Sequence, residues 1–349
     1  FKLPMWRFCN SGSAATRDAI QLCRAATRRE QIVKIESGYH GMHESVCVSV
    51  WADLEEIGPY DSPNSVPSLT GVPKEMTDLT LIVPFNCPES VLSARLASDD
   101  VACVIMEPVM MNCGIIAPRA GFLEMVQRVC RHHGTLLVFD EVKSGLTLGP
   151  GGATAMFGVV PDLVTLGKAL GGGTPVAAIG MTAHMAETHV VTGEPGTVST
   201  FGGSALAMAA ARATLCSVLT EEAYARMTAL NQHLAEGVRR ALSEVEDIVS
   251  GRVVTCGAAK GCIFFSASNT EKTQGADDVA VEQYRDVLQL GELHLELGDL
   301  MASVFAEEGV WLGAGDEEWT LSVAHTESDI ERFVGAFRVF CSELRRGLS

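Results

Sequence analysis

The sequence predicts an α/β protein with a large domain, built on a mostly parallel sheet, and a smaller C-terminal α/β domain. Two observations support this prediction. In the first two thirds of the chain, short continuous apolar runs alternate with longer amphipathic runs, as in sheets whose strands are buried on both faces. From about residue 204 the pattern becomes mainly helical and then returns to short strands. We therefore expect the large domain over residues 1–220 and the small domain over residues 221–349.

The elements of the large domain follow from these runs in chain order. A strand-like stretch is already under way at Phe1, so we expect a further segment upstream of this sequence. Helices are expected over 10–27 and over the amphipathic stretch 120–134. Buried strands are expected at 102–108, 135–142, 162–168 and 175–181.

The small domain follows a helical run at 204–219. Its predicted elements are a helix at 221–245, short strands within 253–266 and at 319–324, and a closing helix at 327–347. Strands and helices are both present, which predicts an α/β unit of its own.

Composition restricts the class of protein and of ligand. The 349 residues are 47% hydrophobic and 20% charged, enough to bury a sizeable core. The net charge of −17 argues against nucleic acid or a membrane surface as partner, so an anionic ligand must be held locally. We find no signal peptide and no run long enough to span a bilayer. The eleven cysteines lack paired short spacings, which is typical of reduced core thiols in a cytoplasmic protein.

Two charged residues stand at the ends of predicted strands. Asp140 closes the apolar run TLLVF, and Lys168 follows DLVTLG and precedes a glycine triplet. The carboxyl ends of parallel strands meet at one edge of a sheet, where ligands bind, so these two side chains can share a site. Taken singly, the aspartate is also explained as a helix cap or structural ion pair, and the lysine as a surface residue.

Two further segments supply complementary chemistry. Asn-Ser-Gly-Ser opens the helix at 10–27, whose first-turn N–H groups and Ser13 hydroxyl can bind a phosphate, although a simple N-cap is the alternative. Tyr39 and His40 lie between glycines after the strand-like IVKIE, where an exposed ring can cover a flat ligand. A buried aromatic is the commoner explanation of such a ring.

A carboxylate, an amine, an aromatic ring and a phosphate site are together what pyridoxal 5′-phosphate requires. The lysine forms a Schiff base, the carboxylate keeps the pyridine nitrogen protonated, the ring covers the cofactor, and the helix start holds its phosphate. The sequence therefore predicts this cofactor.

The chain resembles the class III (subgroup II) aminotransferases of fold type I and, within them, the glutamate-1-semialdehyde aminomutase branch. The resemblance follows the whole chain in order, and its most specific block runs from Asp140 to Gly173. The matching landmarks are NSGSAAT, GYHG, GVPK, VIMEPV, LLVFDEVKSG, PDLVTLGKALGGGTPVAAIGM, STFGGSALAMAAA, GCIFFS and SVAHTESDI.

The resemblance implies roles for individual residues around the cofactor. Lys168 would carry the Schiff base, Asp140 would pair with the pyridine nitrogen, and Val142 and Tyr39 would pack on opposite faces of the ring.

It also implies the phosphate site and the rest of the pocket. The phosphate would lie at Gly12, Ser13 and Ala14, joined by Thr200 from the neighbouring subunit of a homodimer with shared active sites. His40, Glu107 and Asn112 would line the cofactor and substrate pocket, and no metal is implied.

Three departures from the family pattern bear on the reaction. The phosphate helix has no acid at Ala14, the loop after Asp140 has Thr147 where many relatives have Arg, and STFGGSA replaces a different loop sequence. These changes favour an aminotransferase that moves an amino group between a small-molecule donor and a keto or aldehyde acceptor. The alternatives are an intramolecular aminomutase or an epimerase, and a catalytically silent scaffold or binding subunit, which the intact Asp140 and Lys168 argue against.

Overall fold

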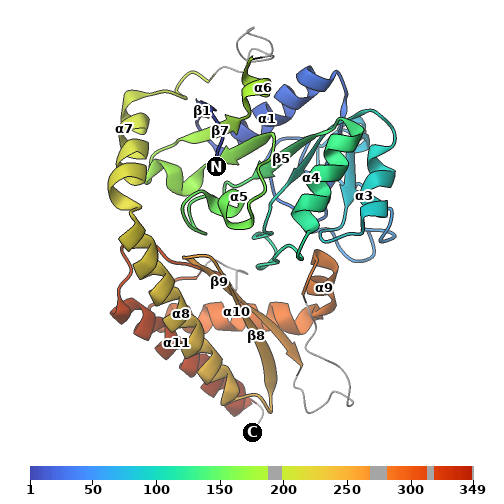
Figure 1. Ribbon diagram of the computed structural model, residues 1–349. Coiled ribbons are helices and arrows are strands. Elements are labelled where there is room, and N and C mark those ends of the chain that lie inside the picture. The colour runs from blue at the N-terminus through green and yellow to red at the C-terminus, as the bar shows by residue number, and fades with distance from the viewer. Residues whose placement is uncertain (188–198, 268–280, 313–317, 348–349) are drawn as a thin grey trace. The chain divides into compact units, whose positions relative to one another are not determined.

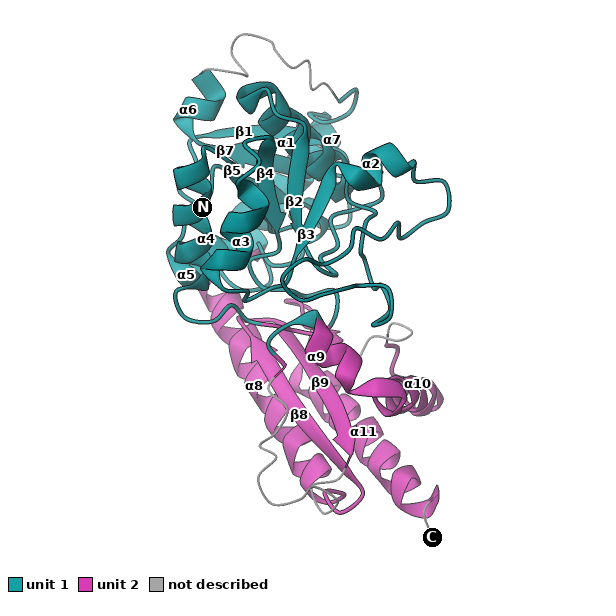
Figure 2. Cartoon of the chain, turned by 90° about the vertical axis from the view of Figure 1, so that its right-hand side faces the viewer, with its two compact units in different colours: residues 1–113, 117–218, 282–284 teal, residues 114–116, 219–281, 285–349 magenta. Residues whose placement is uncertain are grey.

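A computed structural model describes residues 1–187, 199–267, 281–312 and 318–347. The chain divides into two compact units, coloured separately in Figure 2. Unit 1 comprises residues 1–113, 117–218 and 282–284, and unit 2 comprises residues 114–116, 219–281 and 285–349. Unit 1 holds a seven-stranded sheet and unit 2 a three-stranded sheet, which confirms the predicted α/β class.

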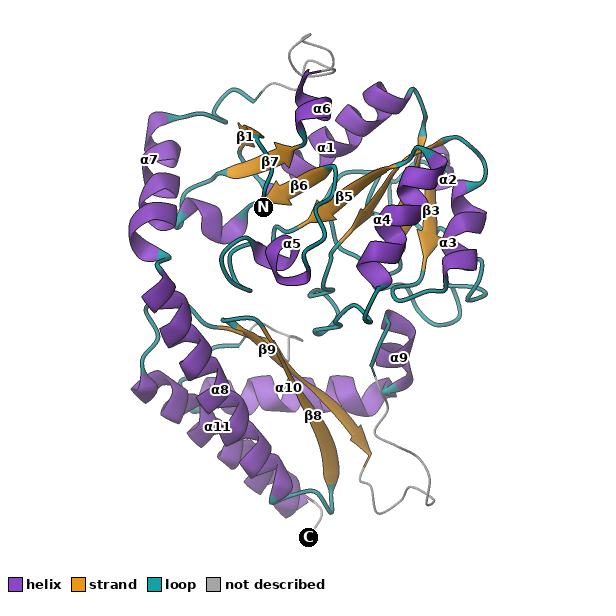
Figure 3. Ribbon diagram, in the orientation of Figure 1, coloured by secondary structure: helices purple, strands orange, loops and turns teal. Residues whose placement is uncertain are grey.

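The sheet of unit 1 is mostly parallel, as predicted. Its strands are β1 (Met5–Cys9), β2 (Gln31–Ile35), β3 (Thr80–Val83), β4 (Val101–Met106), β5 (Leu136–Asp140), β6 (Leu163–Leu166) and β7 (Ala177–Met181). They lie in the order β1-β7-β6-β5-β4-β2-β3 (Figure 3). Strands β2 to β6 pair in parallel, whereas β7 is antiparallel to both β6 and β1. All six residues of β4 are buried, which accounts for its continuous apolar run.

Helices cover this sheet on both faces. They are α1 (Gly12–Thr27), α2 (Lys74–Asp78), α3 (Glu89–Leu96), α4 (Phe122–His133), α5 (Gly152–Phe157), α6 (Ala183–Met185) and α7 (Ala205–Ala213), with a 3₁₀ turn η1 (Lys168–Gly171) and a π-helical turn η3 (Thr214–Val218). Helix α1 packs against β4, β6 and β7, while α3 and α4 pack on each other and against β3 and β5. In Figure 3, α3 and α4 lie together in front of the sheet.

Unit 2 has its own hydrophobic core. Most of its helices and strands are labelled in Figure 1. Its elements are α8 (Glu221–Ser243), β8 (Val249–Cys256), β9 (Lys260–Ala267), α10 (Gly291–Glu307), β10 (Glu318–Thr320) and α11 (Glu327–Gly347), with α9 (Tyr284–Gln289) starting in the last residue of unit 1. The helix predicted over 204–219 is divided into α7 and η3. The strand predicted over 319–324 ends at Thr320, because the Ser322 hydroxyl and the His325 ring accept backbone N–H groups and form a turn.

The burial of four cysteines agrees with the expectation of core thiols. Cys9, Cys23, Cys47 and Cys103 are buried, and all eleven cysteines are free thiols. Burial raises the pKa of the Cys9 thiol to about 11, as expected for an inert core residue. Among the described residues, no helix has both the length and the apolar character needed to cross a membrane.

Candidate active site

A cavity of about 220 Å³ lies in unit 1, next to the carboxyl ends of β4, β5 and β6 and the start of α1. Nine of the residues predicted from the sequence line it, namely Gly12, Ser13, Tyr39, His40, Glu107, Asn112, Asp140, Val142 and Lys168. Gly41 and Lys143 line it as well. Residues far apart in the sequence therefore meet where parallel-sheet proteins bind ligands.

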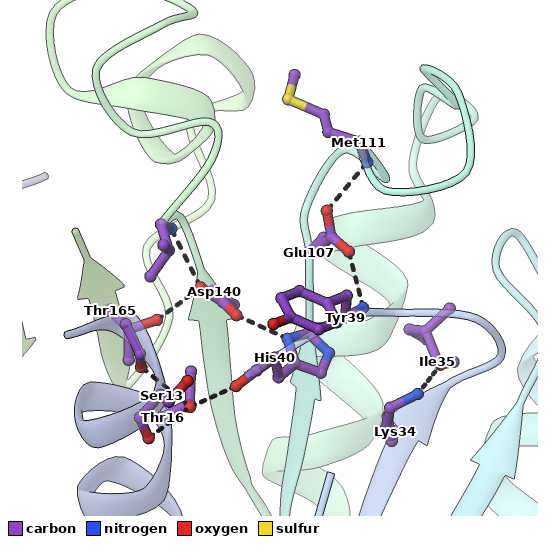
Figure 4. Close-up of polar contacts among 12 residues, drawn as sticks. Ser13, Thr16, Lys34, Ile35, Tyr39, His40, Glu107, Met111, Asp140 and Thr165 are labelled. Atoms are coloured by element: carbon purple, nitrogen blue, oxygen red, sulfur yellow. Dashed lines mark hydrogen bonds and ion pairs between the residues drawn. The ribbon is translucent and has the colours of Figure 1, made fainter. Parts of the chain in front are cut away.

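Asp140 is the last residue of β5 and is held by three donors (Figure 4). Its Oδ1 accepts hydrogen bonds from the Thr165 hydroxyl at 2.8 Å and from the Val142 N–H at 3.1 Å. Its Oδ2 lies 2.7 Å from His40 Nδ1. A carboxylate can only accept, so Nδ1 carries the hydrogen of this bond. These three bonds offset the cost of burying the carboxylate.

His40 is a buried residue of the cavity wall and couples the loop after β2 to Asp140. Its backbone carbonyl accepts a hydrogen bond from the Thr16 hydroxyl of α1 at 2.6 Å. Its Nε2 is buried and has no hydrogen-bond partner in the described part of the chain. A Cβ atom at Gly38 would lie 3.0 Å from this nitrogen, so glycine leaves room for the ring. His40, which the resemblance implies in the pocket, therefore acts as a hydrogen-bond donor to Asp140.

The start of α1 lies at the cavity and packs closely against its neighbours. Ser11 is the N-cap, and its hydroxyl accepts a hydrogen bond from the Ala14 N–H at 3.2 Å. A Cβ atom at Gly12 would lie 2.9 Å from Val142 Cγ1. Gly41 has φ +103°, and a Cβ atom there would lie 2.4 Å from the Ser13 hydroxyl oxygen. Glycine at these two positions therefore lets Val142 and Ser13 pack directly on the backbone beside the cavity.

Of the three residues of α1 predicted to bind the phosphate, two line the cavity and one does not. Gly12 and Ser13 line the cavity, and the Ser13 hydroxyl accepts a hydrogen bond from the Met42 N–H at 3.2 Å. Ala14 is not among the lining residues, and its N–H is the one that Ser11 caps.

Tyr39 supplies a flat apolar surface at the cavity. Its ring stacks on Trp51, with centroids 5.8 Å apart and planes inclined by 9°. The Trp51 indole N–H donates to the Asn112 carbonyl at 2.7 Å. The Glu107 carboxylate accepts the N–H of Tyr39 at 3.1 Å and that of Met111 at 3.0 Å (Figure 4). Glu107 therefore joins the loop of Tyr39 to the loop of Asn112.

Lys34 is a fully buried lysine of β2 beneath this loop pair. Its Nζ donates to the Ile35 carbonyl at 3.2 Å. Burial lowers the pKa of Lys34 to about 7, and the carboxylates of Glu107 and Glu36 oppose that shift.

Lys168 follows β6 in a backbone conformation that is rare for its type. Its φ is +45°, and it opens the 3₁₀ turn η1 directly after Gly167. Gly172 and Gly173 also have positive φ, at +53° and +103°, so these two glycines provide a turn that other residues adopt only at a cost. A non-glycine residue held in this region next to a cavity is a feature of functional sites.

Comparison with known proteins identifies the family. The sequence profile described as "Aminotransferase class-III" matches residues 3–327. The chain belongs to this family. It is 34% identical over 342 residues to a glutamate-1-semialdehyde 2,1-aminomutase of Akkermansia muciniphila, covering 97% of this chain and 74% of the relative. It is 37% identical over 340 residues to the enzyme of that name from Ignicoccus hospitalis, covering 96% and 74%.

Solved structures of a transaminase and an aminomutase share the fold. An omega-transaminase from Sphaerobacter thermophilus superposes with a TM-score of 0.86 at 27% identity, over 98% of this chain and 75% of that chain. A glutamate-1-semialdehyde aminomutase from Pseudomonas aeruginosa PAO1, crystallised in complex with PMP, superposes with a TM-score of 0.83 at 28% identity, over 99% and 73%. The predicted family and fold type are thereby confirmed.

The cavity of this class-III aminotransferase family member fits pyridoxal phosphate. Lys168 and Asp140 supply the amine and the carboxylate, and Tyr39 supplies a ring face. Gly12 and Gly41 let Val142 and Ser13 pack closely on the backbone at the start of α1, and Gly12 and Ser13 line the cavity there. The first-turn N–H groups of a 16-residue helix suit a phosphate. The described residues contain no cluster of His, Cys, Asp or Glu that could hold a metal.

Sequence reasoning also missed residues of this site. No sequence pattern indicated that Thr165 and Trp51 belong to the site. Thr165 is a polar residue within an apolar strand, and Trp51 lies in an irregular loop. Gly41 and Lys143 belong to the quoted motifs GYHG and DEVKSG but were given no role. Thr200 lies in an exposed turn and does not line the cavity of its own chain.

Proposed function

We propose that this chain binds pyridoxal 5′-phosphate in the unit 1 cavity and moves the amino group of a small molecule. The observation that carries the proposal is that Lys168 and Asp140, at the ends of neighbouring strands, line one cavity together with the start of α1 and Tyr39. A catalytically silent subunit has no need of this set of side chains.

The chain's own residues would divide the work as follows. Lys168 would bind the cofactor covalently and, once released, its Nζ would carry a proton to and from the substrate carbon. Asp140 would hold the ring nitrogen in its protonated form, and His40, Thr165 and the Val142 N–H keep the carboxylate oriented for this. When bound, the cofactor supplies an electron-withdrawing ring that acidifies the bond next to the substrate nitrogen.

The remaining pocket residues would position the cofactor. Gly12 and Ser13 would hold its phosphate, while Tyr39 and Val142 would enclose its ring. Glu107 would fix the Tyr39 loop through the two backbone N–H groups that it accepts.

Two finer reactions are compatible with this site. Relatives named glutamate-1-semialdehyde 2,1-aminomutase, at 34% and 37% identity, favour an amino shift within one molecule, which we propose as the first candidate. The departures at Ala14 and Thr147, together with the likeness to an omega-transaminase, support intermolecular transfer to a keto or aldehyde acceptor as the second.

We also propose a homodimer in which each site takes Thr200 from its partner. The support is the glycine- and hydroxyl-rich stretch STFGGSA, whose Ser204 caps α7. An anion bound by both chains would couple cofactor affinity to association.

The reaction is tested by giving the cofactor-loaded protein one substrate without an acceptor. Conversion of glutamate-1-semialdehyde to the isomer with its amino group on the adjacent carbon supports the aminomutase. Amino transfer that requires an added keto acid or aldehyde supports the aminotransferase instead. Absence of both reactions, with a panel of amines and acceptors, contradicts the proposed function.

A further inference from the structure

We propose that Trp51 is a positioning residue of the unit 1 cavity, which holds the ring of Tyr39 in place to cover the ring of the cofactor. This inference rests on the proposed function of the cavity. It adds to that function a residue that does not line the cavity and that acts through two residues that do, Tyr39 and Asn112.

The rings of Trp51 and Tyr39 form two layers beside the cavity. Their centroids are 5.8 Å apart and their planes are inclined by 9°, which is an offset stack. Tyr39 lines the cavity, whereas Trp51 is not among the described lining residues. The Tyr39 ring therefore has one face against Trp51 and leaves the other for a flat ligand. A ring that is already held in place loses less entropy when such a ligand binds.

The indole N–H of Trp51 fastens the tryptophan to a second wall of the cavity. It donates to the Asn112 carbonyl at 2.7 Å. Asn112 lies in the loop after β4 and Tyr39 in the loop after β2, and these two strands are neighbours in the sheet. One side chain thus joins two loops of the cavity, and the indole can shift only if the stack or the hydrogen bond is broken.

The backbone of Trp51 is held in a conformation that bulky residues rarely adopt. Its φ is +52°, in the left-handed region. Its N–H donates to the Ser37 hydroxyl at 3.4 Å, and the N–H of the preceding Val50 donates to the Ser68 hydroxyl at 2.8 Å. Strained residues of this kind cluster at ligand-binding sites, where the surrounding contacts maintain them. The loop therefore fixes the direction in which the indole leaves the backbone.

The exposure of Trp51 separates it from the tryptophans of the core. Its side chain lies at the surface with 57% of the residue exposed, whereas Trp319 in unit 2 is 4% exposed. Burial of apolar area therefore explains less of its placement than it does for Trp319. The competing explanation is that Trp51 only fastens its own loop to the Asn112 carbonyl, without any effect on how Tyr39 covers a ligand.

Titration of the cofactor-free protein with pyridoxal phosphate separates these explanations, with the visible circular dichroism of the bound cofactor as the signal. Trp51→Ala removes the ring, whereas Trp51→Phe keeps an aromatic ring and loses the indole N–H. The matched control is Trp311→Ala, which removes an indole of unit 2 that is 88% exposed. Tyr39→Ala, alone and combined with Trp51→Ala, completes a double-mutant cycle.

We expect Trp51→Ala to weaken cofactor binding by roughly 3- to 10-fold, because the stacked pair that holds Tyr39 is lost. Its dichroism per bound cofactor should also change, since this signal depends on how the protein surrounds the cofactor ring. Trp51→Phe should recover most of the affinity, and Trp311→Ala should bind as wild type does. In the Tyr39→Ala background, Trp51→Ala should have a clearly smaller effect.

Three results would overturn the inference. The first is that Trp51→Ala binds the cofactor as tightly as wild type. The second is that Trp51→Ala weakens binding equally with and without Tyr39, because Trp51 would then not act through that ring. The third is that Trp51→Phe binds no better than Trp51→Ala, because the stacked ring would then make no difference.

A further variant guards against a folding defect. Urea unfolding of cofactor-free Trp51→Ala should show one cooperative transition. If it does not, Trp51→Leu replaces it in the titration and in the cycle, since leucine fills apolar volume without offering a flat ring. The same results then support or overturn the inference.

Borohydride reduction keeps this test separate from the proposed function. Wild type and Trp51→Ala, each saturated with cofactor, are reduced and mapped, and both should carry the label on Lys168. A label on Lys168 together with unchanged affinity in Trp51→Ala overturns only the role of Trp51. Absence of the label from Lys168 in wild type contradicts the proposed function itself.

Discussion

Thr165→Val tests how the structure holds the carboxylate of Asp140. Thr165 is fully buried in β6, opposite Asp140 in the register of β5 and β6, and its hydroxyl donates to Oδ1 at 2.8 Å. Valine has nearly the same shape and is at least as favourable in a strand, so the substitution removes the donor without opening a cavity.

The expected cost follows from that geometry. A hydrogen bond to a charged group contributes about 1.5–3 kcal/mol to stability. The added methyl group returns about 0.8 kcal/mol through burial, so we expect a net loss of roughly 1–2 kcal/mol. Urea unfolding at constant pH measures this as a lower midpoint with an unchanged slope.

A double-mutant cycle identifies the partner of the lost bond. In an Asp140→Asn background the charged acceptor is gone, so Thr165→Val should cost clearly less than it does in wild type. Equal costs in both backgrounds would refute the reasoning, because the hydroxyl would then stabilise the strand without Asp140.

Three further predictions concern Gly41 beside the start of α1, the buried Lys34 and the proposed dimer. Gly41→Ala should weaken cofactor affinity, measured by equilibrium titration, far more than Gly71→Ala does. Both glycines have φ near +100°, but only a Cβ at Gly41 meets a neighbouring side chain. Equal effects of the two substitutions would instead assign the loss of affinity to backbone strain. Since burial lowers the pKa of Lys34 from 10.5 to about 7, the unfolded chain binds more protons between these values, and stability rises with pH across this window. Urea unfolding should therefore show Lys34→Met gaining most over wild type below pH ~7 and losing this advantage toward pH ~10, whereas a gain independent of pH would contradict the assignment. If each site takes Thr200 from the partner subunit, mixing Lys168→Ala chains with Thr200→Ala chains should give activity above that of either parent. This test requires that Thr200→Ala alone is strongly impaired. No recovery of activity after verified subunit exchange would contradict the role of Thr200.

Local sequence patterns were sufficient for the parts of this site that lie at strand ends. Asp140 and Lys168 interrupt apolar runs, so their charges were visible without the fold. The antiparallel direction of β7 could not be predicted in this way, because an apolar run does not indicate the direction of its strand.

The missed contacts depend on residues that are far apart in the sequence. Thr165 reaches Asp140 only through the register of β5 and β6, and Trp51 stacks on Tyr39 only through the path of a loop. The family resemblance implied Ala14 at the phosphate, whereas its N–H donates to the Ser11 hydroxyl and the residue does not line the cavity. The homodimer, the cytoplasmic location and the domain boundary at residue 220 remain predictions.

Reduction of the cofactor-loaded protein identifies the lysine that binds the cofactor, which we propose is Lys168. The protein is loaded with pyridoxal phosphate, reduced with borohydride, digested and mapped by mass spectrometry. The chain contains seven lysines, and two of them, Lys143 and Lys168, line the cavity. We expect the pyridoxyl label on Lys168 and its loss in Lys168→Ala. A label on Lys143 or Lys260 instead would contradict it.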